Sequence, residues 1–233
     1  MSDQNDKLKN LKTSSMDRRL SIAKASLLAG TRWATANASS FFSSDEEKEK
    51  KRKKAMTEQA NYLVSEIGKL KGSIVKIGQM MALYGEHFLP EEITQALNTL
   101  NNQTVALAWP AIKEHLQEQL GDKLHELTID HEPIGTASLA QVHRATRKSD
   151  GLELVLKIQY PGVAEAIDSD MSLFKNMLKL TRMVPQTREF DQWFEEVREM
   201  MHREVSYDIE SATTRRFAER LKHDPRYVVP HII

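Results

Sequence analysis

The chain has 233 residues, of which 40% are hydrophobic and 28% charged, a composition typical of a soluble globular protein. Lysine plus arginine and aspartate plus glutamate both number 33, so a net charge of zero favours neither nucleic acid nor an anionic membrane as a partner. The absence of cysteine excludes disulfides and cysteine metal sites. No run of apolar residues is long enough for a transmembrane helix, and the polar first residues do not resemble a secretion signal.

The first half of the chain is predicted to be helical. Residues 1–19 are polar and are expected to form a disordered tail, and residues 20–35 carry apolar side chains at helical spacing. The charge run 45–54 is acidic first and basic later, which suits the start of a solvated helix. The strongest helical pattern covers residues 56–84, where the apolar stripe consists of Leu63, Ile67, Leu70, Ile74, Ile77 and Met81.

Two shorter helices are predicted next. One opens at Pro90, and the other covers residues 109–120 and stops at the glycine that follows. Gly72 and Gly78 lie inside the preceding helical pattern, where each costs up to about 1 kcal/mol relative to alanine. Such a cost suggests that the helix packs closely against another element.

From about residue 125 the hydrophobic period becomes that of strands. Residues 127–129 and 139–146 are predicted strands. In the third, residues 152–159, the leucines and Ile158 share one face and Lys157 lies on the other. Helical patterns follow at 163–184 and 190–222, separated by Pro185, and the last seven residues resemble the start of another strand.

Residues 133–142 read Pro-Ile-Gly-Thr-Ala-Ser-Leu-Ala-Gln-Val, which has the spacing of a kinase phosphate loop with alanine at two glycine positions. Backbone N–H groups that bind phosphate must be approached closely, and glycine permits this. Alanine in a left-handed conformation costs roughly 1–2 kcal/mol. The loop therefore either follows a different path or is a plain hairpin that binds no phosphate.

Lys157 favours the nucleotide interpretation. A long cation in the middle of a strand, opposite an apolar face, could contact α- and β-phosphates, with Val142 and Val155 beside the adenine. The alternative is a lysine extended over the surface. A kinase-like lysine also needs a carboxylate from a later helix, and residues 195–210 supply several. His202 lacks a second histidine at ligand spacing, so no metal site is expected there.

Together these segments resemble the UbiB/AarF family of atypical protein-kinase-like proteins over roughly residues 20–233. Lys76-Ile77-Gly78-Gln79 matches the family's K-x-G-Q motif, and residues 133–145 match its alanine-rich loop. Residues 156–163 match the strand that carries the nucleotide lysine and the turn after it.

The resemblance implies an α+β fold, in which a helical N-terminal extension packs on a protein-kinase-like small lobe of antiparallel sheet and helices, with the large lobe missing. The expected domains are the tail 1–19, the extension 20–122 with the K-x-G-Q motif, and an incomplete small lobe at 123–233.

The resemblance also assigns roles to individual residues. Lys157 is the expected nucleotide lysine and Glu210 its helix partner. Glu204 takes the first position of the family's E-x-D motif, near Lys76, whereas Ser206 replaces the aspartate and Asp208 is a candidate substitute. The expected cofactor-binding residues are Gly135, Thr136, Ala137, Ser138, Ala140, Val142, Val155, Lys157 and Glu210. The expected regulatory residues are Lys76, Gln79 and Glu204, and no catalytic or metal-binding residue is expected in this chain.

By the same resemblance, the intact protein binds ATP or ADP and supports ubiquinone biosynthesis, as a cytoplasmic protein at the periphery of the inner membrane. Its K-x-G-Q helix covers the place where a protein substrate would dock, which favours ATPase or small-molecule kinase activity. The H-x-D catalytic loop and the D-F-G motif are absent from the chain, so Mg²⁺ binding belongs to the missing C-terminal half and the chain alone is expected to be inactive.

The expected partners are the nucleotide and an isoprenoid lipid or membrane surface, with no nucleic acid. Two other classes of function stay open: a non-catalytic helical module that binds lipid or membrane, and a helical scaffold without a ligand.

Overall fold

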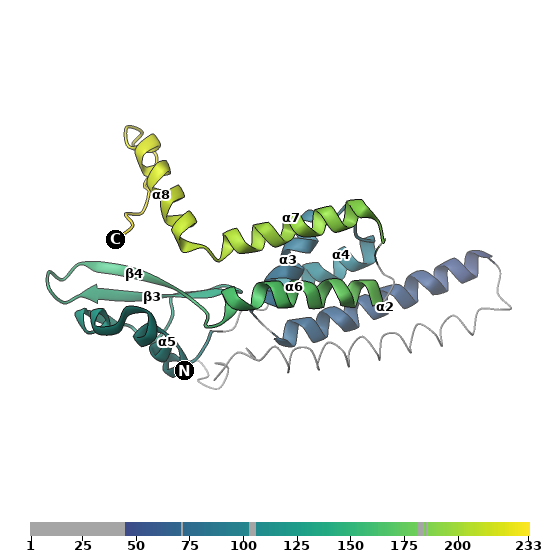
Figure 1. Ribbon diagram of the computed structural model, residues 1–233, viewed down its shortest axis with the longest axis horizontal. Coiled ribbons are helices and arrows are strands. Elements are labelled where there is room, and N and C mark those ends of the chain that lie inside the picture. The colour runs from purple at the N-terminus through teal and green to yellow at the C-terminus, as the bar shows by residue number, and fades with distance from the viewer. Residues whose placement is uncertain (1–44, 71, 103–105, 181–183, 185) are drawn as a thin grey trace.

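The computed structural model describes residues 45–70, 72–102, 106–180, 184 and 186–233. The predicted tail 1–19, the predicted helix 20–35 and Pro185 lie outside these residues. A group of helices forms one end of an elongated molecule and a small sheet forms the other, with helix α8 standing over the sheet (Figure 1). The elements in chain order are α2 (Asp45–Leu70), α3 (Ser73–Tyr84), α4 (Glu91–Asn98), η1 (Thr99–Asn102), α5 (Trp109–Leu120), η2 (Gly121–Glu126), β1 (Leu127–Ile129), β2 (Gly135–Thr136), β3 (Ala140–Arg147), β4 (Glu153–Gln159), α6 (Val163–Leu180), α7 (Arg188–Glu204) and α8 (Tyr207–Leu221).

The charge run at 45–54 begins helix α2, as its acid-first order predicts. The prediction of a single helix over 56–84 is wrong, because the pattern is divided between α2 and α3. Gly72 stands at the break with φ of 68° and ψ of −145°, a backbone conformation that only glycine adopts readily. The apolar period continues through the break, so periodicity alone could not reveal it.

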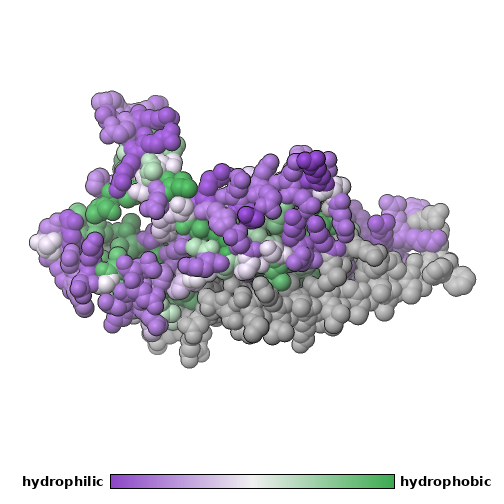
Figure 2. Space-filling model, in the orientation of Figure 1, coloured by the Kyte–Doolittle hydropathy of each residue, from purple (hydrophilic) through white to green (hydrophobic). Residues whose placement is uncertain are grey.

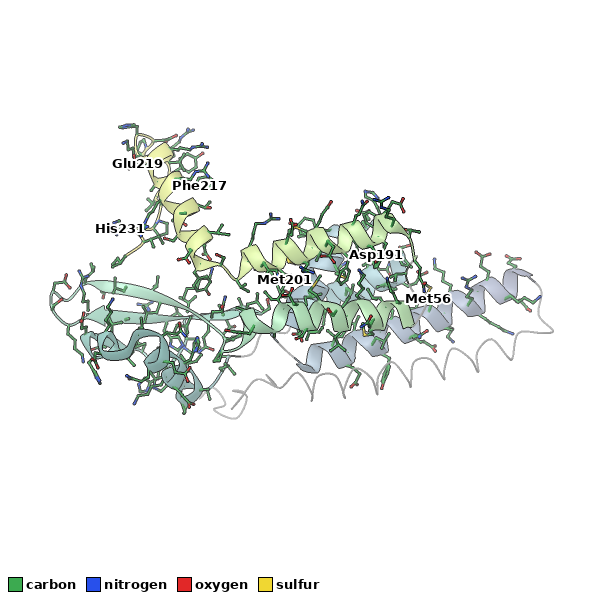
Figure 3. All side chains as sticks on the ribbon, viewed as in Figure 1. Met56, Asp191, Met201, Phe217, Glu219 and His231 are labelled. Carbon is green, nitrogen blue, oxygen red and sulfur yellow. The ribbon has the colours of Figure 1, made fainter. Side chains whose placement is uncertain are left out.

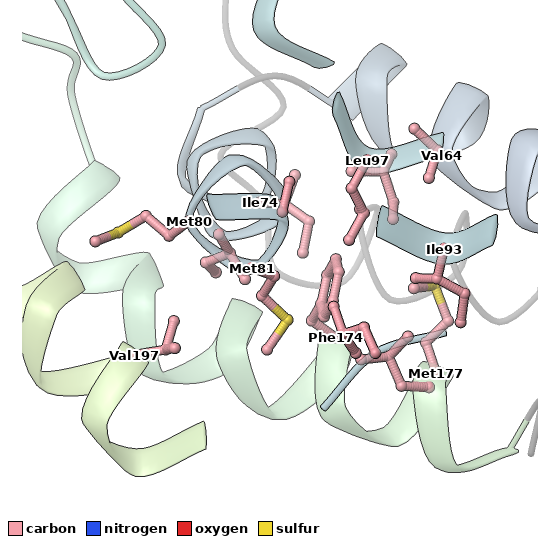
Figure 4. Close-up of a cluster of buried hydrophobic side chains, with 14 of the residues drawn as sticks. Val64, Ile74, Met80, Met81, Ile93, Leu97, Phe174, Met177 and Val197 are labelled. Atoms are coloured by element: carbon pink, nitrogen blue, oxygen red, sulfur yellow. The ribbon is translucent and has the colours of Figure 1, made fainter. Parts of the chain in front are cut away.

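The larger hydrophobic core joins α2, α3 and α4 with the later helices α6 and α7 (Figure 4). Its fully buried side chains include Met81 of α3, Leu97 of α4 and Phe174 of α6. A Cβ atom at Gly78 would lie 2.5 Å from Cδ1 of Leu100, so α3 and the η1 turn approach as closely as the glycine permits. This confirms the close packing that the mid-helix glycine suggested.

The sheet is antiparallel, with β3 between β4 and the two short strands β1 and β2. Its second core packs α5 and the preceding Leu107 against residues such as Leu139 and Ile158. Burial increases along β4, from the 41% exposed Leu152 before the strand to Ile158, which is 5% exposed. The predicted strands and the helix 109–120 are confirmed to within one residue, and the α+β class is confirmed.

The two cores do not follow the predicted domain boundary between residues 122 and 123. Helices α6 and α7 come after this boundary in sequence but share the core of α2, α3 and α4. Val205, at the end of α7, packs against both cores and so links the two ends of the molecule.

Two predictions near the C-terminus are wrong. The helix expected over 190–222 is divided into α7 and α8, because Ser206 is extended at φ −89° and ψ 97°. The side-chain amide of Gln159 donates a hydrogen bond of 3.1 Å to the backbone oxygen of Val205, a contact that holds the break against β4. The expected strand over the last seven residues is irregular, because no sheet strand pairs with it in the described structure.

Candidate functional site

Strand register brings three of the predicted site residues into one row across the sheet. Gly135 of β2 is opposite Val142 of β3, and Val142 is opposite Lys157 of β4. Residues directly opposite each other in antiparallel strands point to the same face. Val155 lies two residues before Lys157 on that face and is 66% exposed. The face is therefore open beside the lysine, whereas the opposite face of the sheet packs on α5.

The alanine-rich loop between β2 and β3 has a path of its own. The N–H of Ala137 donates to the oxygen of Ala140 at 2.8 Å, which closes the loop on itself. Ala140 already belongs to β3 and pairs with Gln159, so this alanine occupies an extended strand and needs no glycine. Leu139 inserts its side chain into the sheet core. Thr136 and Ala137 stay exposed on the loop.

Gly135 is a glycine that the fold itself does not require. Its φ lies outside the left-handed region, and a Cβ atom at this position would have no neighbour within 4 Å. Among the described residues, neither strain nor packing explains the missing side chain. Glycine is also used where a ligand approaches the backbone closely, and the residues beside Gly135 fit such a use.

Lys157 meets the carboxylate of Glu210, the helix partner that the resemblance implied. Its Nζ donates hydrogen bonds of 2.7 and 2.6 Å to the two oxygens of Glu210, which lies on the first turn of α8. Both side chains are about half exposed, at 47% and 48%. The same Nζ stands 4.9 Å from the centre of the Tyr207 ring.

Tyr207 is half-buried at the start of α8 and was not singled out from the sequence. Burial, together with the negative charges of Glu210 and Glu204, raises the pKa of its phenol to about 12. The hydroxyl therefore stays protonated at neutral pH. A lone tyrosine after the E-x-S sequence carries no distinctive signal, because its role depends on the turn between α7 and α8.

A second ion pair joins the K-x-G-Q helix to the end of α7. Nζ of Lys76 lies 2.6 Å from Oε1 of Glu204, with the lysine side chain 22% exposed. The amide of Gln79 instead donates to the backbone oxygen of Leu100 at 3.1 Å, so this residue braces the helical core. Ser206 begins α8 without a side-chain hydrogen bond to the helix.

A hollow of about 720 Å³ lies between α8 and the C-terminal segment. Its polar walls include Lys157, Glu204 and Glu210, and its apolar walls include Phe217 and Val229. Figure 2 shows apolar surface where α8 rises from the sheet, and Figure 3 shows Phe217 on α8 and His231 on the segment that returns beside it. None of the alanine-rich loop residues lines this hollow, so it and the strand face with Gly135 are separate surfaces that meet at Lys157.

A buried polar network behind the site was missed in the sequence. Gln141 and His143 are both fully buried on β3. The Gln141 amide accepts from the N–H of Leu107 at 2.8 Å and donates to the oxygen of the same residue at 3.4 Å. Nδ1 of His143 is 2.7 Å from the backbone oxygen of Asp130, which can only accept, so Nδ1 carries a proton. Nε2 then accepts from Gln141 at 2.8 Å.

This network fixes β3 against the segment before α5, and it is why two polar residues interrupt an apolar strand face. Among all the described residues, His, Asp and Glu side chains form no group of three or more that could hold a metal ion. His202 lies 2.9 Å from a carboxylate oxygen of Asp168. No helix in the described ranges is long and apolar enough to span a membrane.

Residues 99–233, more than half of the chain, match the ABC1 atypical kinase-like domain. The chain belongs to the ABC1 atypical kinase-like family. This membership confirms the UbiB/AarF resemblance, and with the observed sheet and helices it confirms the fold of a kinase-like small lobe with a helical extension.

Several curated relatives carry the name of atypical kinase. Atypical kinase COQ8, mitochondrial, from Saccharomyces cerevisiae is 31% identical over 172 residues, which are 73% of this chain and 34% of that protein. Atypical kinase COQ8B, mitochondrial, from Danio rerio is 32% identical over 176 residues, or 74% of this chain and 28% of that protein. The chain therefore spans about a third of the length of these relatives.

Among solved structures, that of Rv3197 with erythromycin, from Mycobacterium tuberculosis, is similar to this chain. The matched region is 80% of this chain and 48% of the Rv3197 chain. Its sequence identity is 28% and its TM-score is 0.46.

Proposed function

We propose that this chain is the nucleotide-binding N-terminal part of an atypical kinase or ATPase, with ATP or ADP as its ligand. The observation that carries the proposal is the paired contact of Lys157 with both carboxylate oxygens of Glu210, on the strand face that also bears Gly135. In kinases, a lysine on this strand contacts the phosphates and a helix glutamate holds the lysine in place.

The chemistry of the strand face fits a nucleotide. Lys157 supplies a cation for phosphate oxygens, and Val142 and Val155 supply an apolar surface suited to a base. Gly135, which the fold does not require to be a glycine, leaves the backbone accessible at the end of the row. We assign the exposed or half-buried loop residues Thr136, Ala137 and Ser138, with Ala140 beside them, to the phosphate side of the ligand.

The bound nucleotide supplies a transferable phosphoryl group, and the residues of this chain bind and orient it. We propose that Mg²⁺ and the catalytic groups come from parts of the full-length protein outside this chain. We further propose, from the family resemblance, that the whole protein supports isoprenoid-quinone biosynthesis at the periphery of a membrane, with Lys76, Gln79 and Glu204 in a regulatory role.

Binding of nucleotide to the purified chain tests the proposal directly. A fluorescent ATP analogue, with ATP and ADP as competitors, should bind the wild-type chain and lose at least about tenfold in affinity in Lys157→Ala, which lacks the phosphate cation. Lys113→Ala, on the exposed side of α5, is the matched control and should bind as the wild type does. Equal affinities for all three proteins would refute the assignment.

Gly135→Ala separates binding from folding. No atom of the described part of the chain stands within 4 Å of the new methyl group, so the melting temperature should be unchanged or slightly raised. Nucleotide affinity should nevertheless fall, because the methyl group would occupy the approach to the backbone. An affinity unchanged in this variant would remove Gly135 from the site.

The chain by itself should not hydrolyse ATP. Mg²⁺-dependent hydrolysis that Lys157→Ala abolishes would show instead that the chain is catalytically complete. Liposome co-sedimentation that is insensitive to Lys157→Ala, together with no nucleotide binding, would favour the lipid-binding module over the kinase part.

A further inference from the structure

Lys157 has a second neighbour besides Glu210. Its Nζ stands over the ring of Tyr207 at 4.9 Å from the centroid, within the range of a cation–π contact. Tyr207 is the first residue of α8, and Glu210 is three residues further along the same helix. The lysine head is thus contacted twice by a single helical turn, once by a carboxylate and once by a ring.

We propose that Tyr207 is a positioning residue for Lys157. The face of the Tyr207 ring keeps the ammonium group of Lys157 directed toward α8 and in line with Gly135 and Val142. The expected effect of Tyr207 on nucleotide affinity rests on the proposed nucleotide function. The positioning geometry stands on contacts of this chain alone.

A ring is useful here because the ion pair with Glu210 is exposed to solvent. Both of its side chains are about half exposed, and pairs of this kind contribute little and are weakened by salt. Tyr207 is half-buried, so its ring is partly enclosed at the start of α8. A phenol with a pKa of about 12 is neutral at physiological pH, so the contact is one between a cation and a neutral ring.

The turn that carries Tyr207 is itself attached to the same strand. Gln159, two residues after Lys157 on β4, donates its amide hydrogen to the oxygen of Val205. Val205 also packs its side chain into both cores. The turn that carries the ring is therefore attached to β4 by this hydrogen bond and to both cores by Val205.

The experiment compares Tyr207→Phe, which keeps the ring and loses only the hydroxyl, with Tyr207→Leu, which loses the ring. The first readout is the rate at which acetic anhydride acetylates Lys157, measured by mass spectrometry with Lys113 as the internal reference. The second is the affinity for the fluorescent ATP analogue. Circular dichroism verifies that both variants are folded.

We expect Lys157 to be acetylated faster in Tyr207→Leu than in Tyr207→Phe, with no change at Lys113. Nucleotide affinity should fall about two- to fivefold in Tyr207→Leu, a loss that corresponds to the energy of an exposed cation–π contact. In Tyr207→Phe it should stay near the wild-type value. An unchanged acetylation rate in Tyr207→Leu overturns the proposal. Equal effects of the two substitutions overturn it as well, because the hydroxyl would then be the active group.

If Tyr207→Leu does not fold, measurements on the wild type and Tyr207→Phe still test the positioning role of the ring. The Hε protons of Lys157 should be shifted upfield by the ring in both proteins, and random-coil shifts in the NMR spectrum overturn the inference. If Lys157 is protected by the ring while the wild type binds no nucleotide, the positioning role holds and the proposed function fails.

Discussion

The buried side chain of Gln141 connects several parts of this protein through hydrogen bonds. Its amide hydrogen-bonds both backbone groups of Leu107 and the ring of His143. The two bonds to Leu107 join segments that are 34 positions apart in sequence. The residue therefore decides how β3 sits on the segment before α5.

We predict that Gln141→Leu lowers the free energy of unfolding by at least about 2 kcal/mol, because leucine would leave buried polar groups without partners. Urea unfolding measures the loss, and hydrogen exchange should show the amide of Leu107 losing its protection. Gln117→Leu, at an exposed position of α5, is the matched control and should change stability by less than about 0.5 kcal/mol. A stable Gln141→Leu variant with a protected Leu107 amide would contradict the network.

Asp150 is the residue whose charge responds most clearly to its local structure. The Arg147 guanidinium, and then the N–H of Leu152, hydrogen-bond its carboxylate and lower its pKa to about 2. A lowered pKa means that the interaction is present above the unfolded-state pKa near 4 and is lost as the pH falls through about 2.

The carbon resonance of the Asp150 carboxyl should therefore show no titration between pH 6 and pH 3. In Arg147→Met, which lacks the guanidinium, the midpoint should return toward about 4. A wild-type midpoint near 4 would mean that the hairpin tip does not form the bonds described here.

At the scale of elements, the breaks between helices matter more than the helices themselves. Gly72 separates α2 from α3 with a conformation at φ 68° and ψ −145°, and its missing Cβ would meet no atom closer than Cγ2 of Val163 at 3.9 Å. The requirement for glycine there is one of the backbone. At Gly78 the requirement is one of space, because Leu100 would lie 2.5 Å from a Cβ atom.

We predict that Gly72→Ala and Gly78→Ala each destabilise the protein by about 1–3 kcal/mol, for these two different reasons. Adding Leu100→Ala to each variant distinguishes them in a double-mutant cycle. The second substitution should relieve part of the cost at Gly78, where it makes room, and none of the cost at Gly72. Strictly additive effects in both cycles would disprove the steric explanation for Gly78.

At the scale of the whole molecule, two cores stand side by side and Val205 packs against both. Phe174 is fully buried in the helical core, whereas Ile112 is fully buried between α5 and the sheet. The helical extension and the sheet are therefore expected to open as separate cooperative units.

We predict that Phe174→Ala, at a cost of about 3–5 kcal/mol, increases hydrogen exchange in α3, α4, α6 and α7 more than in β3 and β4. Ile112→Ala, at about 2–5 kcal/mol, should produce the opposite pattern. Mass spectrometry of exchanged peptides measures both. Uniform acceleration throughout the chain in either variant would show one cooperative unit.

Patterns of nearest neighbours were enough for several parts of the fold. The span of α5 and the alternation of β4 depend on residues a few positions apart, and the structure agrees with both. The contact of Lys157 with Glu210 joins residues 53 positions apart, and it was expected only because the segments resemble a known family.

The two breaks between helices could not be predicted from such local patterns. The helical pattern runs unbroken through Gly72 and through Ser206, because apolar spacing does not show where the backbone turns. The role of Tyr207 was hidden for the same reason. Its ring reaches Lys157 only because α8 begins there and turns back over β4.

The sequence alone thus determines most of the helices and strands, the α+β class and the motifs that identify the family, since these depend on local periodicity and residue type. Tertiary contacts decide that α6 and α7 pack with the helices far before them, and that Lys157 lies between Glu210 and Tyr207. They do so because burying an apolar face, or pairing a charge, depends on which distant surface is available, and no local pattern records that surface.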